Sequence, residues 1–232
     1  MRRPPGLAAH RAPPAVLPMA LMTAALMTAA LFAAAGCGST PITGPRRPGS
    51  QPVLLAYGHS YVAGIHGQPP PWPGLLANTL HLPLVTVAHG GDVASRCLSR
   101  MAASPDRPAD GDVVIWECDI NDVRRYGTDP SHLESFRRTL VAALGRMRHG
   151  RVVIVEDPPI TGWGLYAPFN HGSQAALDAY NTVIERTVSP PVHVVKIVGW
   201  DPATMLGIDA VHPNEEGKRV IADSVAAVVP TA

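Results

Sequence analysis

The chain has 232 residues, with 19 Lys and Arg against 18 Asp and Glu, and therefore a formal net charge of +1. This balance argues against a nucleic-acid partner, which would require a basic excess or a basic patch. Hydrophobic residues make up 46% of the chain, which is enough to bury a core and argues against wholesale disorder. Its 3 cysteines are too few for a disulfide scaffold and lack the CxxC spacing of a zinc site.

Residues 1–36 have the pattern of an export signal. Three arginines near the start are followed by residues 12–36, which carry no charge and are mostly apolar. The run Ala34-Ala35-Gly36-Cys37 resembles the lipobox of bacterial lipoproteins, which implies that Cys37 is lipidated and becomes the new N-terminus. The protein would then be held by lipid on the outer face of the cell membrane.

Two other interpretations of this segment remain open. It is long enough to be an uncleaved membrane anchor, because about 20 apolar residues can span a bilayer. It could also be cleaved near Ala35, which would secrete the protein freely. All three interpretations place the rest of the chain outside the cytoplasm.

Residues 37–51 are predicted to be a flexible tether, and residues 52–232 one folded domain. The tether is rich in Gly, Pro, Ser and Thr and has no hydrophobic periodicity. The remaining length is normal for a single domain, which we expect to act as a monomer.

Five short apolar runs in this domain are predicted to be strands. They are continuous and rich in β-branched residues, a pattern typical of strands that are covered on both faces. The runs are residues 53–57, 84–88, 113–116, 152–155 and 192–198.

Helical periodicity falls between these runs. Apolar residues recur at steps of three and four over 133–147, 177–188 and 217–228. We expect Ser131 to cap the first of these helices and Pro213 to lie in the first turn of the last. Alternating strands and helices predict a parallel α/β sheet, in which ligands bind beyond the carboxyl ends of the strands.

Residues that follow the first three strands carry groups suited to acyl transfer. Ser60 either exposes a nucleophilic hydroxyl or only caps a helix. Gly91, in Gly90-Gly91-Asp92, either lets backbone N–H groups approach a ligand or makes a turn. Asn121 offers a side-chain N–H to a ligand or to a loop.

Asp209 and His212 lie three residues apart near the C-terminus. This spacing lets one turn bring a carboxylate to an imidazole, fix its tautomer and leave the other nitrogen free as a base. The alternative is a solvated loop with a surface histidine. The remaining histidines show no ligand-like pairing, so the expected chemistry needs neither a metal nor a cofactor.

Together and in this order, the four blocks resemble the SGNH (GDSL-like) hydrolase family, named for Ser, Gly, Asn and His. The resemblance spans residues 53 to about 229. It implies a flavodoxin-like, three-layer α/β fold, with a five-stranded parallel sheet in the order 2-1-3-4-5 and helices on both faces. It also implies a serine esterase that cleaves an O-acyl ester through an acyl-enzyme on Ser60.

The resemblance assigns a role to each matching residue. Ser60 matches the nucleophile, His212 the base and Asp209 the residue that orients the base. The three donors of the oxyanion hole are matched by the backbone N–H of Ser60, by Gly91 and by Asn121.

Two positions depart from the family pattern. His59 replaces the Asp of Gly-Asp-Ser, and Asp119 replaces the first Gly of Gly-x-Asn-Asp. Both lie beside the oxyanion region, so we expect them to affect substrate and rate rather than reaction type, and we expect His59 to be a surface histidine. They also support an alternative function, a non-catalytic envelope lipoprotein that uses this fold to bind a glycan. An α/β-hydrolase is disfavoured because the Ser60 motif lacks the second Gly of G-x-S-x-G.

An envelope location favours O-acetyl groups on glycans, or lipid esters, as the substrate. Two segments either line an acyl or sugar pocket or serve only packing. One is a stiff, proline-rich stretch at residues 69–73; the other is an aromatic group formed by Trp163, Tyr166 and Phe169.

Cys97 and Cys118 are the only cysteine pair once Cys37 is set aside. Because the expected compartment is oxidising, we predict a disulfide between them at the rim of the site; the alternative is two buried thiols. Such a bridge would close about 20 residues and contribute roughly 3 kcal/mol.

We predict that Cys37→Ser releases the protein from membranes or leaves its precursor uncleaved. One acyl chain holds a protein only marginally, so the several chains of a lipoprotein provide the anchor, and they would be lost with the cysteine. Membrane fractionation combined with mass spectrometry of the N-terminus tests this. Unchanged membrane retention with an intact Met1 would support the transmembrane interpretation instead.

Overall fold

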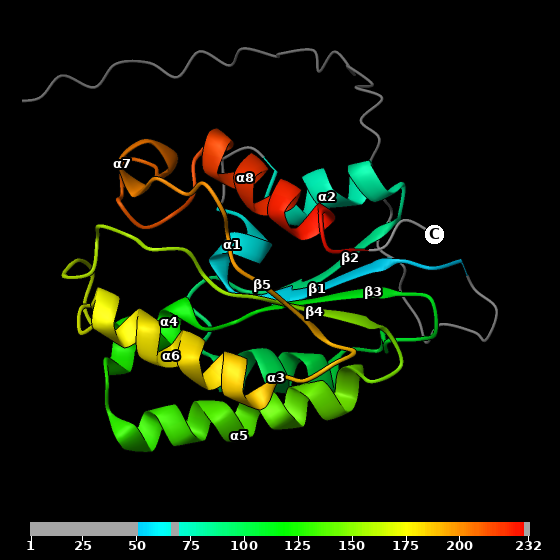
Figure 1. The fold of residues 1–232 in the computed structure, drawn as a ribbon, viewed down its shortest axis with the longest axis horizontal. Helices are drawn as coiled ribbons and strands as arrows, with labels where there is room; N and C mark the ends of the chain where they lie inside the picture. Colours follow the sequence, from blue (N-terminus) through cyan, green and yellow to red (C-terminus); the bar gives the residue numbers. More distant parts are fainter. Residues whose placement is uncertain (1–50, 66–69, 230–232) are drawn as a thin grey trace, which may run out of the picture. The chain divides into compact units, whose positions relative to one another are not determined.

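The apolar runs form five parallel strands in the computed structural model, which describes residues 51–65 and 70–229 (Figure 1). They pair in the order β2-β1-β3-β4-β5, so the predicted sheet is confirmed. The strands are β1 (Leu54–Gly58), β2 (Leu84–Ala88), β3 (Val113–Glu117), β4 (Arg151–Val155) and β5 (His193–Val195).

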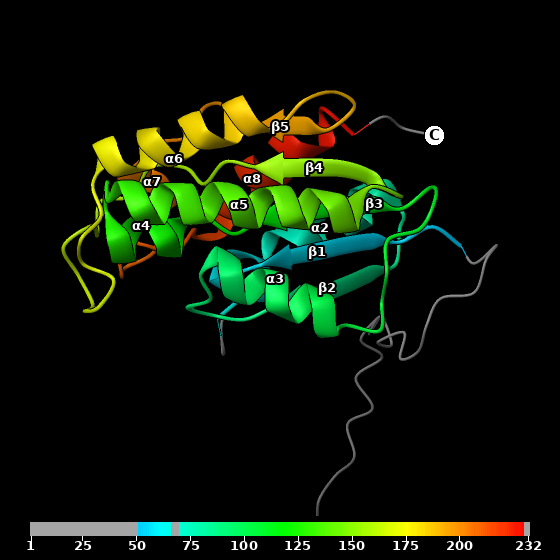
Figure 2. The same ribbon diagram turned by 90° about the horizontal axis from the view of Figure 1, so that it is seen from below.

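Helices cover both faces of this sheet. One layer contains α1 (Ser60–Ala63), α2 (Trp72–Leu80) and α8 (Glu215–Ala226). The other contains α3 (Ala94–Ala103), α4 (Ile120–Tyr126), α5 (Pro130–Met147) and α6 (Gln174–Thr187), and Figure 2 is viewed from this side. A further short helix, α7 (Pro202–Met205), precedes the last connection.

The two layers enclose separate hydrophobic cores, because successive strand residues point to opposite faces of a sheet. Leu55 and Tyr57 of β1 enter the core beneath α3–α6, whereas Leu54 and Ala56 enter the core beneath α1, α2 and α8. Every residue of the central strands β1 and β3 is buried, as their continuous apolar runs predict.

Strand β5 is shorter than the predicted run of residues 192–198. Its three residues pair with residues 153–155 of β4. Beyond Val155 the neighbouring chain reaches Pro158 and Pro159, which have no backbone N–H to donate. The ladder therefore ends where the fourth strand loses its donors.

Two helices begin at residues other than those predicted. Asp129, not Ser131, caps α5, and its carboxylate accepts the backbone N–H of Ser131 at 2.8 Å. Asn214 caps α8, so Pro213 lies before the helix and not in its first turn. In both cases the capping carboxylate or amide reaches helix N–H groups that would otherwise lack an acceptor.

The proline-rich segment serves packing where the structure describes it. Trp72 and Pro73 begin α2, with the proline in the first turn, where a missing N–H costs nothing. The Trp72 side chain is fully buried, and its indole N–H donates to Glu117 Oε2 at 2.8 Å. Trp72 therefore belongs to the core and not to a substrate pocket.

Cys97 and Cys118 are buried and carry free thiols in the structure, and the disulfide between them stays a prediction. Cys97 lies on α3 and Cys118 follows β3, and both side chains belong to one hydrophobic core and not to the rim of a site. Burial, followed by the neighbouring Cys97 thiol, raises the pKa of Cys118 well above its ordinary value. A thiol in such surroundings is unreactive and acts as a small apolar side chain.

The predicted signal, Cys37 and the tether up to residue 50 lie outside the described residues. Within residues 51–65 and 70–229, no helix has the length and apolar character needed to cross a membrane.

Asp112 fixes the amino-terminal edge of the sheet. Its side chain is fully buried and accepts the backbone N–H groups of Val53 at 3.0 Å and Ala109 at 2.8 Å. One carboxylate thus joins the residue that precedes β1 to the turn that precedes β3.

Asp112→Asn should lower the free energy of unfolding by about 1–3 kcal/mol, because one N–H would face an amide NH₂ and lose its acceptor. Chemical denaturation measures this change. The control is Asp110→Asn on the same turn, where the side chain is 97% exposed and stability should not change. Equal stabilities of the two variants would contradict the prediction.

Candidate active site

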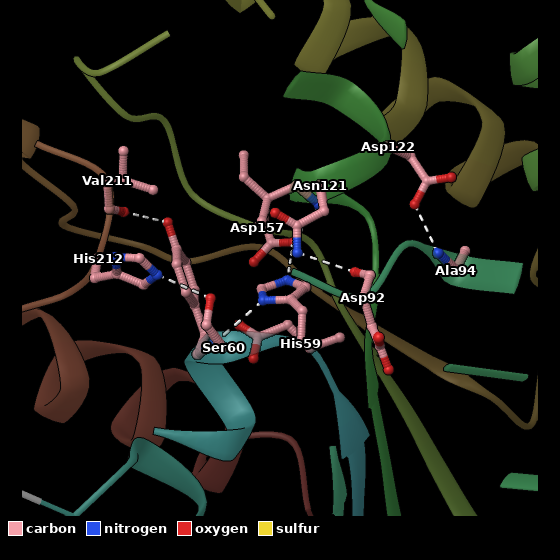
Figure 3. Close-up of polar contacts among 12 residues, drawn as sticks. His59, Ser60, Asp92, Ala94, Asn121, Asp122, Asp157, Val211 and His212 are labelled. Atoms are coloured by element: carbon pink, nitrogen blue, oxygen red, sulfur yellow. Dashed lines mark hydrogen bonds and ion pairs between the residues drawn. The ribbon is translucent and has the colours of Figure 1, made fainter. Parts of the chain in front are cut away.

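The candidate site lies at the carboxyl edge of the sheet, where the strand order reverses. Gly58, at the end of β1, pairs in register with Ala88 of β2 and Glu117 of β3. Chain segments that leave these three strands therefore emerge side by side. Figure 3 shows side chains from these segments pointing toward one another, together with His212 from near the C-terminus.

Ser60, His212 and Asp209 form a continuous hydrogen-bonded chain. Ser60 is the first residue of α1, and its Oγ lies 2.9 Å from His212 Nε2 (Figure 3). The other ring nitrogen, Nδ1, lies 2.6 Å from Asp209 Oδ2. The side chains of His212 and Asp209 are 24% and 27% exposed, so a substrate can reach them.

A tight turn holds the Asp209–His212 pair. Asp209 Oδ1 accepts the backbone N–H groups of Val211 at 3.0 Å and His212 at 2.9 Å. Ala210 between them has a φ of 58°, a left-handed conformation that strains a residue with a side chain. The Tyr61 hydroxyl donates to the Val211 carbonyl and ties this turn to α1.

The pKa values of Asp209 and His212 are shifted in the directions that suit a base and the residue that orients it. Burial raises the pKa of Asp209. Hydrogen bonds from the His212 backbone N–H, the His212 ring and the Val211 N–H lower it by more, so the pKa of Asp209 lies below its ordinary value. Burial lowers the pKa of His212 below its ordinary value, although Asp209 acts in the opposite direction. At neutral pH the carboxylate is charged and the imidazole is free to accept a proton.

Three groups are the candidate oxyanion donors: the backbone N–H groups of Ser60 and Gly91 and the side-chain amide of Asn121. Gly91 has a φ of 78°, which favours glycine, and a Cβ added at Gly90 would lie 3.8 Å from Ser60 Cβ. In the described part of the chain, the backbone N–H groups of Ser60 and Gly91 donate to no other residue. Asn121 is buried and donates one side-chain N–H to the Asp92 carbonyl at 2.9 Å, which leaves its second N–H for a ligand.

Two carboxylates that stand in these motifs, but received no role from the sequence, lie next to the candidate donors in the chain. The Asp92 side chain forms an ion pair with Arg100. Asp122 accepts the backbone N–H of Ala94 at 2.7 Å at the start of α3, and burial raises its pKa to about 8. Both residues follow proposed oxyanion donors directly, but the sequence does not show which distant N–H or cation they contact.

His59 is not the surface histidine that we expected, because its side chain is fully buried. Its Nδ1 accepts the backbone N–H of Tyr61 at 3.3 Å, and its Nε2 lies 2.9 Å from Asp157 Oδ2. Burial lowers the pKa of His59 to about 4. Asp119, the second departure from the family pattern, is 1% exposed and lies in the same region, so neither residue can contact a glycan at the surface.

The aromatic residues after β4 separate into different roles. Trp163 packs against a hydrophobic core, whereas Tyr166 is 60% exposed. A Cβ added at Gly91 would lie 3.9 Å from the Phe169 ring, so Phe169 lies beside the oxyanion donors. The hollow next to the Ser60 hydroxyl is small, about 10 Å³, and is lined by Ser60, Tyr61, Gly64, Ile65, His212, Pro213 and Lys218.

The comparisons with known proteins agree with this geometry. The model of the GDSL-like lipase/acylhydrolase family matches residues 56–220. No curated protein sequence matches the chain.

Three solved structures with similar folds have low sequence identity to the chain. A lipase/acylhydrolase from Enterococcus faecalis is 12% identical with a TM-score of 0.60, covering 76% of this chain and 94% of its own. A member of the lipolytic G-D-S-L family from Veillonella parvula is 16% identical with a TM-score of 0.59, covering 77% and 98%. LAE5, an alpha/beta hydrolase from the metagenome of Lake Arreo, is 19% identical with a TM-score of 0.55, covering 76% and 94%. At this identity the likeness shows the fold.

The ring of His212 should titrate below its ordinary pKa of 6.5, because burial disfavours the imidazolium. Asp209→Asn should move the midpoint lower still, since the hydrogen bond and charge of Asp209 favour the protonated ring. NMR titration of the ring signals measures both midpoints. Asp223→Asn, on the exposed face of α8, is the control and should leave the midpoint unchanged. A midpoint that rises in Asp209→Asn would contradict the assignment.

Proposed function

Because the chain belongs to the GDSL-like lipase/acylhydrolase family, we propose that it is a serine ester hydrolase that works through an acyl-enzyme on Ser60. The observation that carries this proposal is the chain from Asp209 through His212 to the Ser60 hydroxyl, with distances of 2.6 and 2.9 Å. Nucleophile, base and orienter are the three parts that acyl transfer requires.

In the first step, Ser60 Oγ attacks the carbonyl carbon of the ester while His212 Nε2 takes the hydroxyl proton. Asp209 keeps the ring proton on Nδ1 and stabilises the imidazolium that forms. The negative charge that develops on the carbonyl oxygen is placed among the N–H groups of Ser60, Gly91 and Asn121. The imidazolium then protonates the departing alcohol oxygen, which leaves the acyl group on Ser60.

In the second step, water replaces the alcohol. His212 Nε2 takes a proton from the water as its oxygen attacks the acyl carbon, and the same donors receive the new oxyanion. Collapse of this intermediate returns the proton to Ser60 Oγ and releases a carboxylic acid.

We propose an O-acyl ester as the substrate, such as an O-acetyl group on a glycan or a lipid ester. The reacting carbonyl would sit in the hollow beside Ser60 and His212. The Phe169 ring beside Gly91 offers apolar surface to the alcohol part of the ester.

The alternative of a non-catalytic glycan-binding protein loses the residues that supported it. It rested on His59 and Asp119, and both are buried. We further propose that the hydrolase acts as a monomer outside the cytoplasm, anchored through lipidated Cys37, on the basis of the signal pattern of residues 1–37.

A fluorophosphonate probe should label wild-type protein at Ser60 and leave Ser60→Ala unlabelled, because the probe reacts only with an activated serine. Ser60→Ala and His212→Ala should each lower kcat for p-nitrophenyl acetate by several orders of magnitude, and the double variant should be little worse, because the residues act as a unit. Mass spectrometry of the labelled peptide and steady-state kinetics provide the readouts.

His149→Ala is the matched control for the histidine, because that ring is exposed and paired with Asp110 far from the site. It should keep wild-type turnover. If wild type resists the probe and hydrolyses neither p-nitrophenyl esters nor acetylated sugars, the proposed function is wrong.

A further inference from the structure

A cluster of buried ionisable side chains lies beneath the nucleophile, and the mechanism above leaves it without a role. It contains His59, Glu117, Asp119 and Asp157, which come from the ends of β1, β3 and β4. All four are at most 2% exposed. Ionised groups are rarely buried unless they are paired, so each proton and each donor in this cluster must be accounted for.

The tautomer of His59 follows from its two contacts. Nδ1 accepts the backbone N–H of Tyr61, so it carries a lone pair and the proton of the neutral ring lies on Nε2. That N–H then donates to Asp157 Oδ2 at 2.9 Å (Figure 3). His59 therefore caps the helix that begins with Ser60 and is itself held by Asp157.

The same oxygen of Asp157 holds a second helix. Oδ2 accepts the backbone N–H of Ile120 at 2.9 Å. Ile120 is the first residue of α4 and directly precedes Asn121. One carboxylate thus joins the start of the nucleophile helix to the start of the helix that carries an oxyanion donor.

Several carboxylate oxygens of the cluster lack a hydrogen-bond donor, and protons on the neighbouring carboxyl groups can supply it. If all three acids were ionised, both oxygens of Asp119 and one oxygen each of Glu117 and Asp157 would have no donor in the described part of the chain. Burial, followed by the charge of Asp157, raises the pKa of both Asp119 and Glu117 well above the ordinary value, so each keeps a proton that it can donate to Asp157. Burial raises the pKa of Asp157 as well, but these donors and the Ile120 N–H favour its charged form.

A bound metal ion explains the hydrogen bonds of this cluster less well than carboxyl protons do. His59, Asp119 and Asp157 each offer a ligand atom, and these atoms lie within 4.8 Å of one another. A metal at His59 Nε2 would need a lone pair on that nitrogen. The proton would then lie on Nδ1, where it would face the Tyr61 N–H, so the observed helix cap would be lost.

We propose that Asp157 is a positioning residue that, through His59 and the Ile120 N–H, fixes the Ser60 hydroxyl relative to the Asn121 amide. This inference rests on the proposed function and extends it, because it assigns a role to a residue that does not touch the substrate. A nucleophile and an oxyanion donor on two separate helices need such a link, since small displacements of reacting groups are costly in rate.

Asp157→Asn tests the inference in the full-length protein. The amide keeps the shape of the side chain but has one acceptor oxygen. If that oxygen accepts the N–H groups of His59 and Ile120, an NH₂ group replaces the second oxygen and cannot accept the protons of Glu117 and Asp119. With p-nitrophenyl acetate, kcat should fall by about 10- to 100-fold while KM stays nearly unchanged, because the transition state depends on alignment more than substrate binding does. The rate of fluorophosphonate labelling should fall in parallel.

Two further variants separate positioning from a loss of folding. Asp112→Asn also removes a buried carboxylate that accepts two backbone N–H groups, but at the opposite edge of the sheet, and it should keep the wild-type kcat. His59→Asn retains a residue that caps helices well and removes the ring that contacts Asp157, so it should fold and show the same loss in kcat. In an Asn121→Ala background, Asp157→Asn should cost less than in wild type, because part of its effect passes through Asn121.

Each outcome is decisive. If wild type is labelled and active, and folded Asp157→Asn and His59→Asn keep its kcat, the positioning role is wrong while the proposed function stands. Should wild type itself be inert, the proposed function fails first. Elemental analysis that finds one metal ion per wild-type chain and none in Asp157→Asn would overturn the inference in favour of a metal site.

Discussion

The hydrogen bond from His59 to Asp157 is the interaction on which the arrangement of the site depends. It lies where β1, β3 and β4 end, among side chains that water does not reach. Two helices begin there, and the first N–H groups of any helix need acceptors from outside it. The Asp157 carboxylate meets that need for α4 directly and for α1 through a histidine. Burial and the neighbouring Asp157 raise the pKa of Glu117 and Asp119 well above the ordinary value, which favours their neutral forms beside it.

The candidate base comes from a distant part of the chain, since His212 lies 152 residues beyond Ser60. Its turn is held by the Tyr61 hydroxyl on the Val211 carbonyl and by the hydrogen bonds that Asp209 accepts from the turn itself. These contacts also keep Ala210 in its strained left-handed conformation. The turn that carries the base therefore meets the Asp157 cluster at Tyr61, whose hydroxyl contacts Val211 and whose backbone N–H donates to His59.

The two departures from the family pattern form one feature in three dimensions. In the sequence, His59 and Asp119 stand in separate blocks and look like unrelated substitutions. In the fold they lie in one cluster with Asp157. A histidine supplies an N–H that a carboxylate at the same position would lack, and the added carboxyl supplies a further proton to donate. Three ionised acids at this place would repel one another, and the histidine N–H gives the Asp157 carboxylate a donor instead.

The sequence by itself determined the strands and the alternation with helices, because strand and helix periodicity are local. The strand order and the meeting of the four blocks at the carboxyl edge were implied by the resemblance to the SGNH family. The sequence also determined the residues that form the Ser60–His212–Asp209 chain, since they stand in ordered motifs. Only the tertiary structure decided that Asp157 holds two helix starts, that His59 is buried and that Cys97 and Cys118 lie in one hydrophobic core. These properties depend on which distant donors and acceptors share a site without water, and spacing along the chain does not encode that.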